Sequence, residues 1–142
     1  MRYHVYASSF ADPEDVRRYR KWFAIYKAQG MSDGKADDLA KAKGDNGQGC
    51  WMDDTSAGSG PSCALPPETM IDIWGSVDAA KHQKLFLECG ERSVTCLVKD
   101  RMPHIAHITN GARIDLNPDA CEALDLKQPV MAFVTYTPLH VA

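Results

Sequence analysis

The sequence lacks a long apolar run, a strong charge bias and a leader in which apolar residues follow basic ones. No apolar stretch is long enough to cross a bilayer, so we expect no membrane span and no membrane partner. The first six residues carry one arginine followed by alternation, so we expect no signal peptide and a protein that is either cytoplasmic when made or exported by some other route. Because 16 Lys and Arg face 19 Asp and Glu, the net charge of -3 argues against nucleic acid as a partner.

Several catalytic motifs are also missing. Residues 44–49 are rich in glycine, but they lack the Lys-Ser or Lys-Thr pair of a phosphate-binding loop. The sequence has no nucleophile elbow and no Cys-x-x-Cys pair. His104 and His107 could form a small metal site with Asp100, but their segment follows a proline and no cysteine pair supports the site. We therefore expect no metal and no cofactor.

The chain has five cysteines, an odd number, so at least one thiol is free or pairs between chains. Cys89 and Cys96 would lie opposite each other in a hairpin with Arg92 and Ser93 at its tip, and we predict a disulfide there. If Glu91 and Arg92 form the tip instead, the two cysteines are diagonal neighbours and bridge less easily. Cys50 and Cys63 flank a loop and could close it. The alternative is that all five are reduced, small buried residues.

The length of 142 residues predicts a single domain over residues 1–142. A helix should begin at Asp12 and end at Gly30, and a weaker helix should run from Ser32 to near Gly44. Residues 44–63 form a long loop, which we expect to be functional or tied down. We interpret residues 11–63 as a helical and loop insertion. Strands are predicted at residues 2–9, 84–88, 93–99 and 129–137.

A helical turn should follow Pro66. We expect the apolar residues of this turn to pack inward, namely Met70, Ile71, Ile73 and Trp74.

The most informative feature is a pair of motifs, Asp-Arg-Met-Pro at residues 100–103 and Ile-Asp-Leu-Asn-Pro at residues 114–118. They place two aspartates at the ends of short apolar runs. The second motif also begins a helix: Asn117 suits the N-cap, Pro118 the first helical position, and Asp119 complements the helix dipole.

This order of motifs over residues 84–137 resembles the double-psi β-barrel family, which includes rare lipoprotein A, barwin, expansins and certain endoglucanases. The resemblance implies a mainly β protein with a helical insertion, built on a six-stranded double-psi β-barrel. A short barrel with an Ala-Leu-Pro-Pro segment at residues 64–67 is also similar to bacteriophage-encoded proteins. The implied function is peptidoglycan binding or lytic cleavage by a phage-type protein.

In those families the aspartate matching Asp115 lies in a groove, and in some of them it is the general acid on a glycosidic oxygen. Because Ile114 and Leu116 flank it, we expect partial desolvation and a raised pKa. A hydrolase would need a second carboxylate, for which the candidates are Asp100, Asp12 and Asp53. A lytic transglycosylase would not. The predicted substrate-binding residues are Arg101, His104, His107, Arg113 and Trp51.

Alternatives remain at this stage. Asp115 could instead bind backbone amides at the start of the helix, and Asp100 with Arg101 could fix the barrel loop. Whether the protein is an enzyme is undecided. It could be a non-catalytic virion protein that contacts itself or other virion proteins through the 12–30 helix, or an oligosaccharide-binding module without catalysis.

Overall fold

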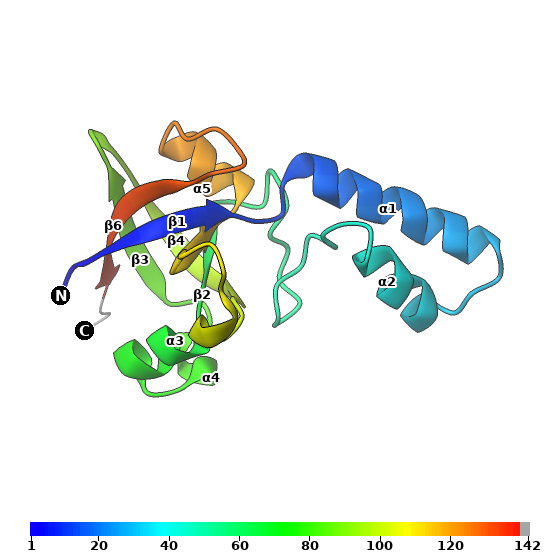
Figure 1. Ribbon diagram of the computed structural model, residues 1–142, viewed down its shortest axis with the longest axis horizontal. Coiled ribbons are helices and arrows are strands. Elements are labelled where there is room, and N and C mark those ends of the chain that lie inside the picture. Colours follow the sequence, from blue (N-terminus) through cyan, green and yellow to red (C-terminus); the bar gives the residue numbers. More distant parts are fainter. Residues whose placement is uncertain (140–142) are drawn as a thin grey trace.

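The computed structural model describes residues 1–139. Six strands form a closed barrel in the order β1-β5-β2-β4-β3-β6, with β6 pairing back to β1 (Figure 1). The strands are β1 Tyr3–Ser9, β2 Ser62–Leu65, β3 Lys84–Cys89, β4 Arg92–Arg101, β5 Ile114–Leu116 and β6 Ala132–Leu139. The helices are α1 Pro13–Ala28, α2 Asp33–Lys41, α3 Pro67–Trp74, α4 Val77–Ala80, α5 Pro118–Ala123 and the 3-10 turn η1 Ile105–His107.

The barrel mixes parallel and antiparallel pairing. β1 pairs with β5 in parallel, and β2 pairs with β4 in parallel, while the other pairings are antiparallel. The predicted fold class, a six-stranded double-psi barrel with added helices, is confirmed. The four strands predicted from periodicity are present, and β2 and β5 complete the barrel.

The core fills the inside of the barrel with alternate residues of each strand. Ile114 and Leu116 of β5 are fully buried, so Asp115 between them points to the opposite, outer face. Along β6, Val134 and Tyr136 are likewise buried and the residues between them face outward. Because side chains alternate along a strand, the residues that point into the core determine which residues lie on the outer face.

The helices α1 and α2 form an arm that extends away from the barrel (Figure 1). They lie within residues 11–63, between β1 and β2. Both predicted starts are present: α1 has Pro13 in its first turn, and the Ser32 side chain accepts a hydrogen bond from the Lys35 amide. Gly30 follows α1 with a positive φ of 87°, as the predicted stop requires.

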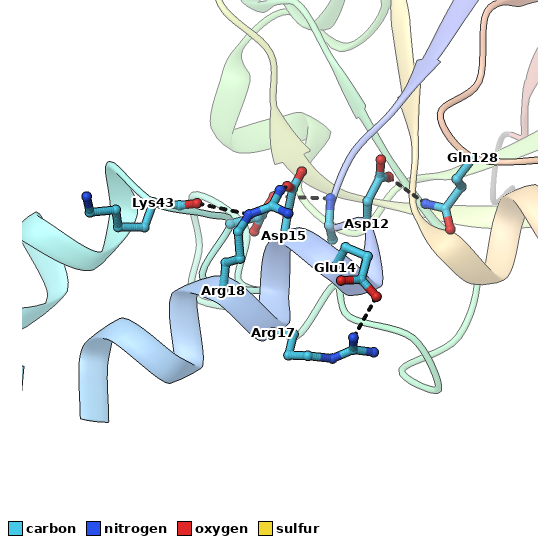
Figure 2. A network of polar contacts seen from close by, with 9 residues as sticks. Asp12, Glu14, Asp15, Arg17, Arg18, Lys43 and Gln128 are labelled. Carbon is cyan, nitrogen blue, oxygen red and sulfur yellow. Dashed lines mark hydrogen bonds and ion pairs between the residues drawn. The ribbon is translucent and has the colours of Figure 1, made fainter. Parts of the chain in front are cut away.

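A polar network joins the base of the arm to the barrel (Figure 2). The Asp12 carboxylate accepts a 2.6 Å hydrogen bond from Gln128 Nε2, in the segment before β6. Because it is used there, it does not cap α1. Arg18 reaches the Asp15 carboxylate and the Lys43 carbonyl, so the same network links α1 to the end of α2.

The long loop after α2 lies between the arm and the barrel (Figure 1) and is tied to α5. The Asp119 carboxylate accepts hydrogen bonds from the Gly58 and Gly60 amides. Asn117 caps α5 by accepting from the Ala120 amide, and it also accepts from the Ser62 amide. The predictions of a tied loop and of a capped helix at Asn117 are confirmed.

The β3–β4 hairpin has a different tip from the one predicted. Cys89 pairs with Arg92, so Gly90 and Glu91 form the turn, and Cys96 lies opposite Leu85. Cys89 and Leu85 are four residues apart along β3, about 13 Å at strand spacing, which is too far for a disulfide. The predicted Cys89–Cys96 bond is therefore wrong.

All five cysteines lie in the described part of the chain, and each is free. Cys50 is exposed whereas Cys63 is buried in the barrel, so the suggested closure of the loop by these two is also wrong. Cys63 instead lies beside Cys96, on the neighbouring strand inside the barrel. Cys63 and Cys96 do not form a disulfide, and burial raises the pKa of the Cys96 thiol.

α3 buries only part of the predicted apolar set. Met70 is fully buried, and Ile73 and Trp74 pack against the core. Ile71 is 53% exposed because it lies on the opposite side of the helix, so its predicted inward position is wrong.

Within residues 1–139, none of the helices combines the length and the apolar character that a bilayer crossing requires.

Candidate functional site

A row of four residues crosses the outer face of the barrel over β1, β5, β2 and β4. Ser8 pairs with Asp115, Asp115 with Ala64, and Ala64 with Asp100. Residues paired across neighbouring strands point to the same face, so these side chains share one surface. Ala64, between the two carboxylates, is buried and packs in a small apolar cluster with Met102 and Ala112.

Asp115 is a half-buried carboxylate with little hydrogen bonding. Among residues 1–139, the hydrogen bond that its carboxylate receives comes from the Ser8 hydroxyl, and no backbone amide donates to it. Burial raises the pKa of Asp115 to about 6, the negative charges of Asp100 and Asp12 add to the rise, and the Ser8 bond opposes it. Asp115 is thus protonated in part near neutral pH, which a general acid requires.

Ile114 and Leu116, the sequence neighbours of Asp115, face the core and not the surface that carries the Asp115 carboxyl. The segment that follows β4 lies beside Asp115 on that surface. Together with Ser8 and Asp115 it lines a hollow of about 210 Å³. The residues contributed by the segment are Met102, Pro103, His107, Ile108, Thr109 and Asn110.

Asp100 is held more firmly than Asp115. Its carboxylate accepts hydrogen bonds from the backbone amides of Cys50, at 2.8 Å, and of Arg101, at 2.7 Å. Burial raises the pKa of Asp100, and the two amide bonds oppose this rise. Asp100 thereby anchors the long loop to β4.

The loop approaches β4 closely at Gly49. A Cβ atom at this position would lie 1.9 Å from the Lys99 carbonyl oxygen, so only glycine fits here. This approach is what brings the Cys50 amide to Asp100.

The other two carboxylates considered as partners of Asp115 lie in different settings. Asp12 is close enough to raise the pKa of Asp115, but its carboxylate binds Gln128. Asp53 lies 2.7 Å from His82 Nε2 and does not contribute to the pKa of Asp115. Neither is a free carboxylate next to Asp115.

His104 and His107, both predicted to bind substrate, lie in different surroundings. His107 lines the hollow of Asp115, whereas His104 turns to Glu68, with Nδ1 3.2 Å from Oε1. Their rings lie edge to face with centroids 6.5 Å apart. Among the contacts of residues 1–139, neither histidine is hydrogen-bonded to Asp100, whose Oδ1 accepts from the two backbone amides.

The other predicted binding residues are spread around the barrel. Arg101 is exposed at the end of β4. Arg113 lines a separate hollow of about 380 Å³ with Tyr3 and Glu68. Trp51 is half-buried and packs against the barrel core, so only part of its ring is free to contact a ligand. The structure brings together Asp115 and His107, with Asp100 two strands away.

Ser8 is the site residue that sequence reasoning missed. Its place beside Asp115 follows from the parallel register of β1 and β5, which are more than a hundred residues apart. The alternating pattern of residues 3–9 predicts a strand but gives no register with a distant partner.

Within residues 1–139, no cluster of three or more His, Cys, Asp or Glu side chains has the arrangement of a metal site.

Comparisons with known proteins agree with the barrel. No family model matches the sequence, and no curated protein matches it either. Among solved structures, a Streptomyces papain inhibitor is similar, with a TM-score of 0.55 and 13% sequence identity over 99% of this chain and 96% of that chain. At this identity the likeness shows the fold alone.

Proposed function

We propose that the protein acts on cell-wall glycan and cleaves it with Asp115 as the general acid. The observation that carries the proposal is a half-buried carboxyl group with a pKa of about 6, facing a hollow and free of backbone donors. Such a group can protonate a glycosidic oxygen near neutral pH. The Ser8 hydroxyl would orient the carboxyl by donating to one of its oxygens, leaving the other toward the substrate.

The geometry favours lytic cleavage over hydrolysis. An inverting hydrolase needs a second, free carboxylate to activate water. Asp100 lies two strands from Asp115, about 10 Å between Cα atoms at strand spacing, and one of its carboxylate oxygens, Oδ1, accepts hydrogen bonds from two backbone amides that hold it to the long loop and to β4. In a lytic transglycosylase the sugar supplies its own nucleophile, so one acid suffices.

Polar residues around Asp115 would bind the sugar hydroxyls. His107, Thr109 and Asn110 line the hollow, and each side chain carries a hydrogen-bonding group. His107 is exposed, so it can contact a ligand without first losing an internal partner. This is the role that we propose for it.

A muropeptide-release assay on purified peptidoglycan tests the proposal. Wild-type protein should release product with a non-reducing anhydro end, and Asp115→Asn should release none while keeping its far-ultraviolet circular dichroism spectrum. Asp38→Asn is the matched control, because Asp38 is an exposed carboxylate on α2, outside the hollow. Wild-type protein that releases no product would contradict the proposal.

The second candidate is a non-catalytic virion protein, for which the arm is the favouring observation. Of the sixteen residues of α1, all described, only Val16 is buried, although Trp22, Phe23 and Tyr26 follow the helical period. A helix with so little covered surface is suited to a contact with another subunit. Absence of muropeptide release, together with self-association that Trp22→Ala abolishes, would favour this candidate. The phage setting rests on the sequence resemblance and is part of the proposal.

A further inference from the structure

Three aromatic rings gather on the outer face of β1 and β6, which lie side by side (Figure 1). Phe133 stacks on His4 with centroids 5.4 Å apart and planes 9° apart, and it packs against Tyr6 at 4.9 Å. We name His4, Tyr6 and Phe133 the aromatic platform. Phe133 is 61% exposed, so its position is not explained by burial in the core.

The platform continues the row of residues that contains Asp115. Tyr6 and Ser8 are two residues apart on β1, about 7 Å along the strand, and both point outward. Ser8 donates to Asp115 on the next strand. The aromatic platform and the acid therefore share one face of the barrel, within a few sugar units of each other.

The edges of the platform are polar. His4 Nδ1 lies 3.1 Å from the Thr135 hydroxyl, and the Tyr6 ring carries its own hydroxyl. An exposed aromatic side chain such as Phe133, bordered by hydrogen-bonding groups, matches a pyranose ring, which has apolar C–H faces and hydroxyls around its rim. A protein strand is a poor fit, because the six described strands form a closed barrel that offers no edge for pairing.

We infer that the aromatic platform is a glycan subsite, which stacks a sugar unit of the chain that Asp115 cleaves. This inference rests on the proposed function, since it commits to the same ligand. It moves the main aromatic contact from Trp51, which packs on the barrel core, to Phe133 and Tyr6.

The test measures retention of protein on insoluble peptidoglycan, using Asp115→Asn as the parent to prevent cleavage. Adding Phe133→Ala should weaken binding about three- to tenfold, as loss of one aromatic contact implies. Adding Phe133→Trp should preserve binding. Ile71→Ala is the matched control, because Ile71 is a similarly exposed apolar residue on α3, outside the platform. Thermal melting shows that each variant is folded.

The outcomes separate this inference from the proposed function. If wild-type protein releases muropeptides but Phe133→Ala binds as tightly as its parent, the platform is wrong and the function stands. If Phe133 is needed for binding but wild-type protein releases nothing, the function is wrong and the platform stands. A parent that is not retained at all overturns the platform, as does Phe133→Ala altering self-association in sedimentation while leaving glycan retention unchanged.

Discussion

Replacing Asp115 by asparagine should stabilise the protein, and the gain should grow with pH. The structure holds this carboxyl half-buried, and burial raises its pKa from the ordinary value of 3.8 to about 6. In the unfolded chain the carboxyl is fully hydrated, so it ionises at lower pH. Between the two pKa values the folded state binds the proton and the unfolded state does not. Stability is therefore lost as pH rises through this window.

The magnitude follows from the size of the shift. Each pKa unit corresponds to about 1.4 kcal/mol, so the rise of Asp115 costs at most about 3 kcal/mol above pH 6. Below about pH 4 the carboxyl is protonated in both states and the cost disappears. Asparagine keeps an oxygen that can accept from Ser8 but never ionises. The asparagine variant should gain about 2 to 3 kcal/mol over wild type between pH 4 and pH 7.5.

Urea denaturation of both proteins at intervals from pH 4 to pH 8 measures this difference. Asp100, whose pKa is also raised by burial, is present in both proteins, so its own titration largely cancels. Asp38→Asn controls for the loss of one negative charge at an exposed position. If the free energies of unfolding of wild type and Asp115→Asn run parallel across this range, the carboxyl is not desolvated. The general-acid argument would then fail with it.

Two further predictions concern the frame of the site. Asn117→Ala should lower the free energy of unfolding by about 3 to 5 kcal/mol in urea, since it leaves the buried amides of Ser62 and Ala120 without an acceptor; Asn117→Asp, which keeps the acceptor oxygen, should lose less, and equal losses would contradict the capping role. In brief alkylation of native protein followed by mass spectrometry, exposed Cys50 should react first and buried Cys63 and Cys96 only after unfolding. A mass short of five alkylations after unfolding without reductant would reveal a disulfide that the structure does not contain.

The sequence predicted the parts of the fold that depend on short-range chemistry. The cap at Asn117, the stop at Gly30 and the start at Pro13 each follow from residues within one turn of the helix end. The hairpin was predicted, but with the wrong tip: the turn is at Gly90, which adopts the positive φ of 60° that tight hairpin turns favour, and not at Arg92 and Ser93. That shift in register is what separates Cys89 from Cys96.

The parts of the site that depend on distant contacts could not be predicted. Asp12 has the identity of a helix cap, yet its carboxylate binds Gln128, a partner 116 positions along the chain. The raised pKa of Asp115 was expected from its apolar neighbours in sequence, but the side chains of those neighbours face the core. The hollow in front of Asp115 is lined instead by residues of the segment that follows β4, which the sequence could not place there.

The two aspartates illustrate why the same residue type takes different roles on one surface. Asp100 lies where the long loop can approach, because Gly49 permits contact with β4, and two backbone amides then donate to one oxygen of its carboxylate, Oδ1. Asp115 lies one strand beyond Ala64, out of reach of that loop, and receives one hydroxyl. The chemistry that we propose therefore depends on which carboxylate the backbone amides can reach. They donate to Asp100, which becomes an anchor for the loop, and they do not donate to Asp115, which can then carry a proton to the substrate.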